Sequence, residues 1–246
     1  MSAIGRIAAS AQAVDHAPPF AHMSALIAGG TGNIGRAIVH GLLMRGATVV
    51  VPSRSASKLD ALYGAQEPVE RSRLIRIVGD ISDERDAERI RAETLARTGR
   101  LDAVVASLGS FLAAPSLLAA DRALLDRVLA DYLVAHFVVA RTFVPVFESS
   151  GGSYLFINGV LAFAPMPGSG LVSVATAGQA MLAEAIIQET TNSRARVNEL
   201  VVSIGVGWGS ADETRRNGER VAGAVANILV DGAAGRRIHL DAEDHA

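Results

Sequence analysis

The stretch ALIAGGTGNIGRAIV, residues 25–39, places Gly29, Gly32 and Gly35 between a short apolar run and an amphipathic pattern. Gly29 permits a sharp exit from a strand, Gly32 lets backbone N–H groups approach a pyrophosphate, and Gly35 allows close packing of the helix that follows. The N-terminus of that helix would face the anion. The stretch therefore predicts a strand, a dinucleotide-binding loop and a helix, and the alternative is a tight turn with a purely structural role.

The rest of the chain alternates short β-branched runs with longer helical patterns. Such alternation is typical of a parallel sheet that is covered by helices on both faces. We therefore expect an α/β fold: a Rossmann-like, doubly wound sheet of about seven parallel strands in a single domain, residues 24–246, after an N-terminal extension, residues 1–23. The expected strands are residues 25–28, 48–52, 74–78, 103–107, 154–158, 198–203 and 237–240. Residues 83–97 are expected to form a charged surface helix.

Composition and charge restrict the class of partner. The chain has 246 residues, 50% of them hydrophobic, and a formal net charge of -2 with acidic and basic residues interspersed. This offers no electrostatic footprint for nucleic acid or an anionic membrane, so a small-molecule ligand is expected. The sequence has no cysteine, which excludes disulfides, thiolate catalysis and Cys-ligated zinc and is compatible with the cytoplasm. No metal site is predicted.

An uncharged segment, residues 149–183, is long enough to suggest a membrane span. Glycines and prolines interrupt it repeatedly, which a lipid-exposed span would not tolerate in this number. We expect a buried strand, a loop and a helix there, and no membrane segment.

The second expected strand ends without the acidic residue that would hydrogen-bond an adenosine ribose. Ser53 and Arg54 stand there instead, with Lys58 one turn further on. An arginine can pair with a 2′-phosphate, which favours NADP(H) over NAD(H); the alternative is that Arg54 merely begins a solvated helix. After the third strand, Asp80 and Ile81 would flank an adenine, or Asp80 would serve as a turn residue or helix cap. The predicted cofactor-binding residues are Gly29, Thr31, Gly32, Asn33, Ile34, Gly35, Ser53, Arg54, Asp80, Ile81, Ser107 and Gly109.

These motifs resemble those of the short-chain dehydrogenase/reductase family, from about residue 24 to residue 240. GGTGNIGRA at residues 29–37 is similar to the family's glycine loop, with Asn33 where the commonest branch has glycine. VVVPSR at residues 49–54 resembles the NADP-type second strand, and GDIS the adenine-contacting turn. VVASLG ends in Gly109, which the family also has at this strand end. The resemblance implies a nicotinamide cofactor and a small-molecule substrate.

The resemblance also implies a catalytic tetrad of Asn, Ser, Tyr and Lys, and this chain departs from it at all four positions. Tyr132 stands at the Asn position, Gly159 at the Ser position, and Val172 and Thr176 at the Tyr and Lys positions. The family's Tyr protonates the alkoxide that hydride transfer to a carbonyl creates, and valine cannot do so. Losing a positioned acid typically costs roughly 10² to 10⁴ in rate. Residues 149–183 contain no Lys, His, Asp or Glu, so shifting the alignment does not restore the relay.

Tyr132 and His136 are the candidate catalytic residues that remain. They are four positions apart on the expected central helix and so share a face, which in the resembled fold borders the catalytic cavity. Tyr132 would supply a proton with His136 polarising it; the alternative is that Tyr132 fills space and His136 packs. The expected substrate pocket consists of Asn158, Gly159, Val172, Thr176 and Trp208.

Small residues on the following helix favour close approach of another helix. They are Ala175, Ala177, Gly178, Ala180, Ala183 and Ala185. This suits the four-helix interface that the resemblance implies, and we expect a homodimer or homotetramer; the alternative is packing on the sheet. The polar residues 209–220 stand where the family has its mobile substrate lid.

The leading functional hypothesis is an NADP(H)-dependent oxidoreductase with non-standard catalytic residues, acting on an activated C=C, C=N or C=O group. One alternative is a catalytically silent NADP(H)-binding sensor or scaffold. Another is a non-redox isomerase or lyase on the same fold.

Overall fold

The apolar runs of the chain pair into one seven-stranded parallel sheet, with strand order β3-β2-β1-β4-β5-β6-β7. The computed structural model describes residues 19–109, 112 and 116–241. The strands are β1 Ser24–Ala28, β2 Thr48–Ser53, β3 Leu74–Val78, β4 Ala103–Ala106, β5 Ser153–Gly159, β6 Arg196–Val202 and β7 Arg237–Leu240. From β1 the chain winds to one edge and returns to place β4 on the other side of β1. The carboxyl ends of β1 and β4 therefore mark the point at which doubly wound folds bind ligands.

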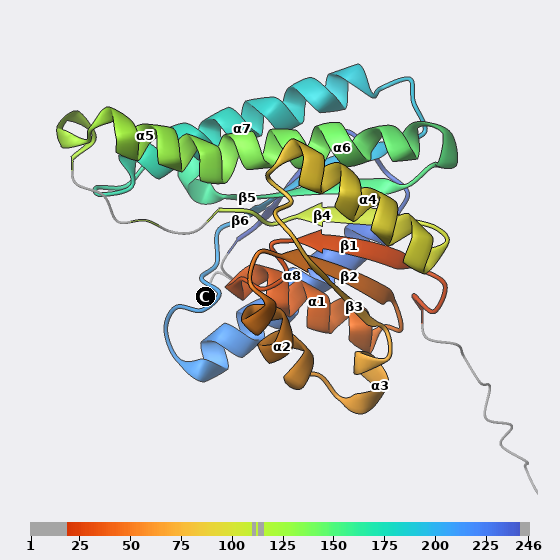
Figure 1. Cartoon of the computed structure of the whole chain (residues 1–246). Helices are drawn as coiled ribbons and strands as arrows, with labels where there is room; N and C mark the ends of the chain where they lie inside the picture. The colour runs from red at the N-terminus through yellow and green to blue at the C-terminus, as the bar shows by residue number, and fades with distance from the viewer. Residues whose placement is uncertain (1–18, 110–111, 113–115, 242–246) are drawn as a thin grey trace, which may run out of the picture.

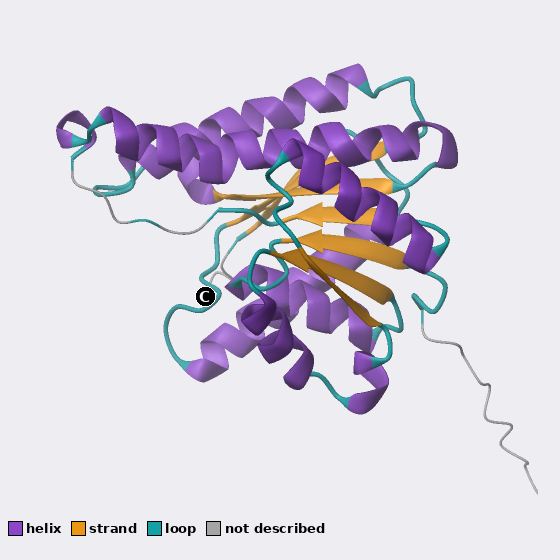
Figure 2. Cartoon of the chain, viewed as in Figure 1, coloured by secondary structure: helices purple, strands orange, loops and turns teal. Residues whose placement is uncertain are grey.

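Helices cover both faces of the sheet (Figures 1 and 2). The helices are α1 Asn33–Met44, α2 Ala56–Gly64, α3 Pro68–Arg71, α4 Glu84–Thr98, α5 Arg122–Leu129, α6 Ala135–Ser150, α7 Gly170–Glu189 and α8 Ala211–Val230, with a π-helical turn Ala130–Val134 between α5 and α6 and short 3₁₀ turns η1 Leu117–Ala119 and η3 Val160–Ala162. One core joins α1, α2 and α8 to the sheet, and a second joins α4, α6 and α7 to the opposite face. The central strands are buried on both faces, which is why their sequences are continuous apolar runs.

The predicted fold class is confirmed, and each predicted strand overlaps an observed one. The third and seventh have the predicted bounds, whereas β6 begins two residues before the expected residue 198. Its pairing with β5 starts at Ser153 and Arg196, and pairing with a neighbour rather than apolar character sets where a strand begins. The charged helix is also observed, as α4, capped by the Asp83 side chain and ended by Gly99 in the left-handed conformation.

The expected extension lies mostly outside the described residues, which begin at residue 19. Phe20 is 5% exposed, and its backbone N–H donates to the carbonyl of Arg45 at 2.9 Å. The body of the protein therefore includes residues just before the predicted boundary at residue 24.

The polar residues 209–220 form the start of α8. Ser210 and Glu213 make a reciprocal capping box, and Gly218 packs beside Ala37 of α1. This stretch is a capped helix against the body of the protein in the structure.

Helix α7 is the one helix of the described chain that is long and apolar enough to cross a membrane. Half of its most apolar window is buried inside the protein. A core helix of a Rossmann-like sheet passes the same test, so its composition is explained by packing.

Candidate functional site

A cavity of about 360 Å³ lies at the carboxyl ends of β1 to β4. It contains most of the predicted cofactor-binding residues: Gly29, Thr31, Gly32, Ser53, Arg54, Asp80, Ile81, Ser107 and Gly109. The other three, Asn33, Ile34 and Gly35, begin α1 behind the loop and do not line the cavity. The sheet thus brings four loops, far apart in sequence, around one hollow.

The glycines of the first loop have the geometry that a phosphate cradle requires. Gly29 has φ +79°, and a Cβ there would lie 2.0 Å from the carbonyl oxygen of Ser107 at the end of β4. A Cβ on Gly35 would lie 2.1 Å from the carbonyl oxygen of Gly29. Any side chain at either position would push the loop away from β4 or from α1. These residues fit a nucleotide pyrophosphate at the N-terminus of α1.

Positive charge gathers at the β2 end of the cavity, where Arg54 and Lys58 lie. Helix α2 begins at Ala56, with Ser55 as its cap, so Arg54 precedes the helix and lines the cavity instead of beginning a solvated helix. Its side chain is 72% exposed, and its guanidinium lies 3.7 Å from the carboxylate of Asp80. An exposed ion pair at that distance is weak, so an anionic ligand can bind Arg54 in place of Asp80.

Asp80 both lines the cavity and shapes the turn after β3. Its carboxylate accepts from the backbone N–H of Ser82 at 3.0 Å and from the Ser82 hydroxyl. The backbone N–H of Asp80 donates to Asp86, and a hydrogen bond from Arg89 together with this one lowers the pKa of the Asp86 carboxyl. Both expectations for Asp80 are therefore compatible with the structure.

The family model for short chain dehydrogenases matches residues 23–206, most of the chain. The chain belongs to this family. Among solved structures it is similar to a dehydrogenase/reductase from Sinorhizobium meliloti, with 25% identity over 94% of this chain and 98% of that one and a TM-score of 0.79. A short-chain type dehydrogenase/reductase from Mycobacterium ulcerans is 21% identical over 90% of this chain and 89% of that one, with a TM-score of 0.80.

A third similar structure is the NADPH-bound form of a short chain oxidoreductase from Pseudomonas aeruginosa, described as containing an atypical catalytic center. It is 21% identical over 92% of this chain and 99% of that one, with a TM-score of 0.79. The comparison with curated proteins gives no significant match. The fold and the membership of the short-chain dehydrogenase family are thus shown.

In this short-chain dehydrogenase, apolar packing surrounds the positions expected for the tetrad. Tyr132 is 7% exposed and lies in a small cluster with Val128, Leu171 and Val172. Its ring contacts the backbone at Gly109, where a Cβ would lie 2.4 Å from the ring. Val172, at the expected Tyr position, is 3% exposed. The space beside Gly109 is therefore filled by an aromatic ring and not by a polar relay.

The predicted hydrogen-bonding residues of the substrate pocket use their polar atoms internally. Asn158 donates to the Thr176 carbonyl at 3.1 Å and to the Glu199 carboxylate at 2.8 Å, and it accepts from the Gly159 N–H at 2.8 Å. The Thr176 hydroxyl donates to the Val172 carbonyl at 2.8 Å. Asn158 and Thr176 are both buried, so neither is available to a ligand in this structure.

The two remaining pocket residues lie differently. Gly159 has open space around the position of a Cβ. Trp208 is 58% exposed. It follows Gly207, which has φ +84° and contacts the side chain of Asn33. Trp208 thus lies on a loop that touches the start of α1.

His136 is fully buried, and neither ring nitrogen has a hydrogen-bond partner within the described part of the chain. Burial lowers the pKa of His136 to about 4. The nearby Leu108 backbone has a smaller, opposite effect on this pKa. The ring stacks on Phe156 with centroids 5.8 Å apart. His136 therefore does not hydrogen-bond to Tyr132 in this structure, and its core packing agrees with the alternative in which His136 packs.

The cavity is lined instead by Asp131 and Ala135, one position before the predicted pair. The π-helical turn Ala130–Val134 explains the difference, since its wider turn rotates the face that a regular helix would present. The i, i+4 spacing of Asp131 and Ala135 equals that of Tyr132 and His136, so spacing alone could not separate the two faces.

An ion pair between a buried glutamate of β6 and a partly exposed arginine of β7 was missed from the sequence. Glu199 is fully buried in the middle of β6 and binds both Asn158 and Arg237 of β7. Arg237 also donates to the Ala180 carbonyl at 3.1 Å and lies over the Phe163 ring. A glutamate inside the apolar strand of residues 197–202 was the available signal. This network ties β5, β6, β7 and α7 together.

Within the described residues, no group of three His, Cys, Asp or Glu side chains could hold a metal ion.

Proposed function

We propose that the cavity binds NADP(H). The glycine loop would hold the pyrophosphate, Arg54 and Lys58 the 2′-phosphate, and Asp80 and Ile81 the adenine, with Asn33, Ile34 and Gly35 supporting the loop from α1. The support is the cradle at Gly29 together with two cations where NAD-specific sites place a carboxylate. The NADPH-bound structure from Pseudomonas aeruginosa, which has the same fold, is consistent with this assignment.

The function that we infer is that of an NADP(H)-dependent oxidoreductase acting on a small molecule. The cofactor supplies a hydride when it is bound. The chain orients it through the cavity residues, of which Ser107 and Gly109 lie toward the nicotinamide half. Val172 and Thr176 offer no acid, His136 is neutral and buried, and Tyr132 is packed among apolar side chains. The substrate must therefore need little help with protonation, as with an activated C=C, C=N or C=O group.

The observation that carries this proposal is the contrast between the two halves of the site. The nucleotide half has its glycines and cations open to a cavity, whereas apolar side chains fill the catalytic half. The same contrast supports a second candidate, a catalytically silent NADP(H)-binding protein. In that case Tyr132 and Val172 would only stabilise the fold.

We further propose a homodimer formed through α6 and α7, which lie side by side in Figure 1. Their outer face exposes large apolar side chains: Val134, just before α6, Phe137, Val174 and Met181, with exposed fractions of 45% to 67%. Of the predicted small residues, Ala177 and Ala185 are exposed, while Ala175, Ala180 and Ala183 face the core. Symmetric burial of this face would remove the apolar side chains from water. The composition agrees with a cytoplasmic protein.

NADPH titration tests the cofactor assignment. The protein has one tryptophan, Trp208, on the loop that contacts Asn33, so NADPH is expected to quench its fluorescence and raise the melting temperature. Arg54→Ala should weaken NADPH at least about tenfold and change NADH little, since a phosphate–arginine pair is lost. Equal effects on the two cofactors would refute the 2′-phosphate assignment.

Turnover then separates the two candidates. NADPH absorbance is followed with a panel of ketones, enones and imines, using a chain shown to bind NADPH. Consumption that depends on one substrate class supports the oxidoreductase. Tight binding without turnover over the whole panel supports the silent protein.

A further inference from the structure

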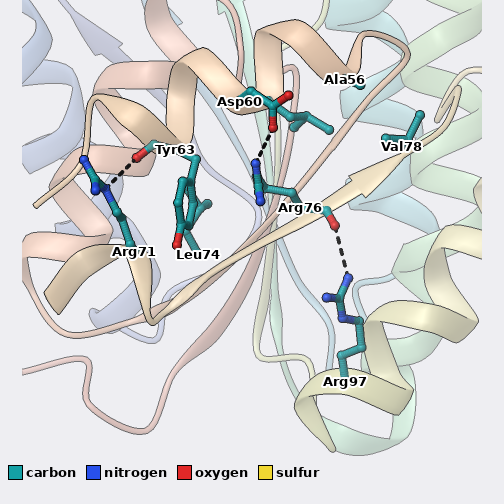
Figure 3. Close-up of a pocket in the computed structure, with 9 residues that line it drawn as sticks. Ala56, Asp60, Tyr63, Arg71, Leu74, Arg76, Val78 and Arg97 are labelled. Carbon is teal, nitrogen blue, oxygen red and sulfur yellow. Dashed lines mark hydrogen bonds and ion pairs between the residues drawn. The ribbon is translucent and has the colours of Figure 1, made fainter. Parts of the chain in front are cut away.

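A second hollow of this protein lies outside the cofactor cavity, at the free edge of the sheet. It measures about 420 Å³ and lies between α2, β3 and α4 (Figure 3). Arginines from three elements surround it: Arg71 of α3, Arg76 of β3 and Arg97 of α4. We call it the arginine groove.

The groove carries more positive than negative charge. Asp60 is the one acidic residue among those that line it, and it pairs with Arg76. Arg97 pairs at 3.2 Å with Glu93, whose carboxylate also serves Arg89 at 3.1 Å. Arg71 has no ion-pair partner among the described residues; it donates to the carbonyls of Tyr63 and Gly64 at 3.1 and 2.9 Å. Carbonyls fix a guanidinium without neutralising it, so the groove attracts anions.

The arginines are held in place before any ligand arrives. The guanidinium carbons of Arg71 and Arg76 lie 5.5 and 4.2 Å from the centroid of the Tyr63 ring. Arg97 donates to the backbone carbonyl of Arg76 at 3.1 Å. The loss of side-chain conformational entropy is a main cost of binding an anion on a protein surface. Here these contacts already order the arginines, so a ligand would cause little further loss.

The groove also has an apolar floor. Leu59 and Leu74 lie at its base with exposed fractions of 2% and 6%, and Val78 is 56% exposed at its rim. Capping of carbonyls accounts for the hydrogen bonds of Arg71 and Arg97. It does not explain why Arg71, which has no ion-pair partner among the described residues, lies beside an open and partly apolar hollow.

We propose that the arginine groove is a second ligand site, which takes a small organic anion with a phosphate or carboxylate on an apolar body. It is separate from the cofactor cavity but adjacent to it. Ser55 and Lys58 of the α2 region line the cofactor cavity, while Leu59 and Asp60 line the groove. The proposal does not depend on the identity of the cofactor or on turnover.

Isothermal titration of the full chain at low salt tests the proposal, with phenyl phosphate, benzoate and inorganic phosphate as probes. We expect saturable binding with one site per chain, tighter for phenyl phosphate or benzoate than for inorganic phosphate, and the stronger of the first two identifies the anionic group. Higher salt should weaken it, because the groove is open to solvent.

Variants locate the binding. Arg97→Gln and Arg71→Gln should each weaken the probe about tenfold, as expected for one charge-assisted hydrogen bond. Arg216→Gln, an exposed arginine on α8, removes the same charge elsewhere and should have no effect. Arg54→Ala should also leave probe binding unchanged. If Arg71→Gln fails to fold because it loses the contacts to the end of α2, the effect of Arg97→Gln on probe binding still tests the proposal.

Three results would overturn the proposal. One is the absence of saturable binding of all the probes. Another is binding that Arg97→Gln leaves unchanged. The third is binding that Arg54→Ala abolishes, which would place the anion in the cofactor cavity.

Discussion

Acidification from about pH 7 to about pH 4 should destabilise the protein chiefly through His136. The pKa of this buried imidazole is lowered by burial from 6.5 to about 4. A group whose folded-state pKa is depressed takes up its proton first in the unfolded chain. The stabilisation is therefore complete above about pH 6.5 and is lost as the pH falls toward 4. A difference of about 2.5 pH units corresponds to about 3 kcal/mol of unfolding free energy.

Burial is the main cause of the lowered pKa of His136, since the side chain is fully buried and both ring nitrogens lack partners in the described part of the chain. The carboxylates affect the stability at lower pH than His136 does. Hydrogen bonds lower the pKa values of Asp86, Glu213 and Asp231 from 3.8, 4.5 and 3.8. The stability that these carboxylates contribute is therefore lost mainly below those pH values. The interval between pH 6.5 and pH 5 is thus governed mostly by His136.

The assay is equilibrium urea unfolding, followed by circular dichroism at several pH values, for the wild type and for His136→Leu. Leucine removes both unpaired nitrogens at similar volume, so the variant should lie within about 1.5 kcal/mol of the wild type at pH 7. It should also lose most of the slope of stability between pH 6.5 and pH 5. An unchanged slope in His136→Leu, or a wild type without a slope, would refute the burial of a neutral imidazole.

Three further predictions concern the glycine loop after β1, the pair of Glu199 and Arg237, and the proposed dimer interface. Gly29→Ala should abolish NADPH binding and lower the melting temperature, because its Cβ would overlap the Ser107 carbonyl, whereas Gly223→Ala in α8 has open space and should stabilise the protein by about 0.5–1 kcal/mol. Glu199→Gln should cost about 2–3 kcal/mol in urea unfolding, since it replaces one of the two accepting oxygens by an NH2 that would face the donor of Asn158 or Arg237; a cost under about 0.5 kcal/mol would contradict the network. Met181→Glu should convert the proposed dimer to a monomer in light scattering, and an unchanged mass would exclude α7 from the interface.

The sequence by itself determined the fold and the place of the nucleotide loop. Both are indicated by contiguous stretches of sequence. Alternating apolar runs can be buried only in a covered parallel sheet, and Gly29 and Gly35 stand where the backbone leaves no room for a Cβ. The predicted third and seventh strands match β3 and β7 residue for residue.

Only the tertiary structure decided which side chains face the site and which are buried under it. The π-helical turn Ala130–Val134 turned Asp131 toward the cavity and left His136 in the core, although both faces have the same spacing in sequence. The pair of Glu199 and Arg237 and the arginine groove join residues from separate strands and helices. Their contacts depend on strand pairing and helix packing between distant parts of the chain, which no local pattern encodes.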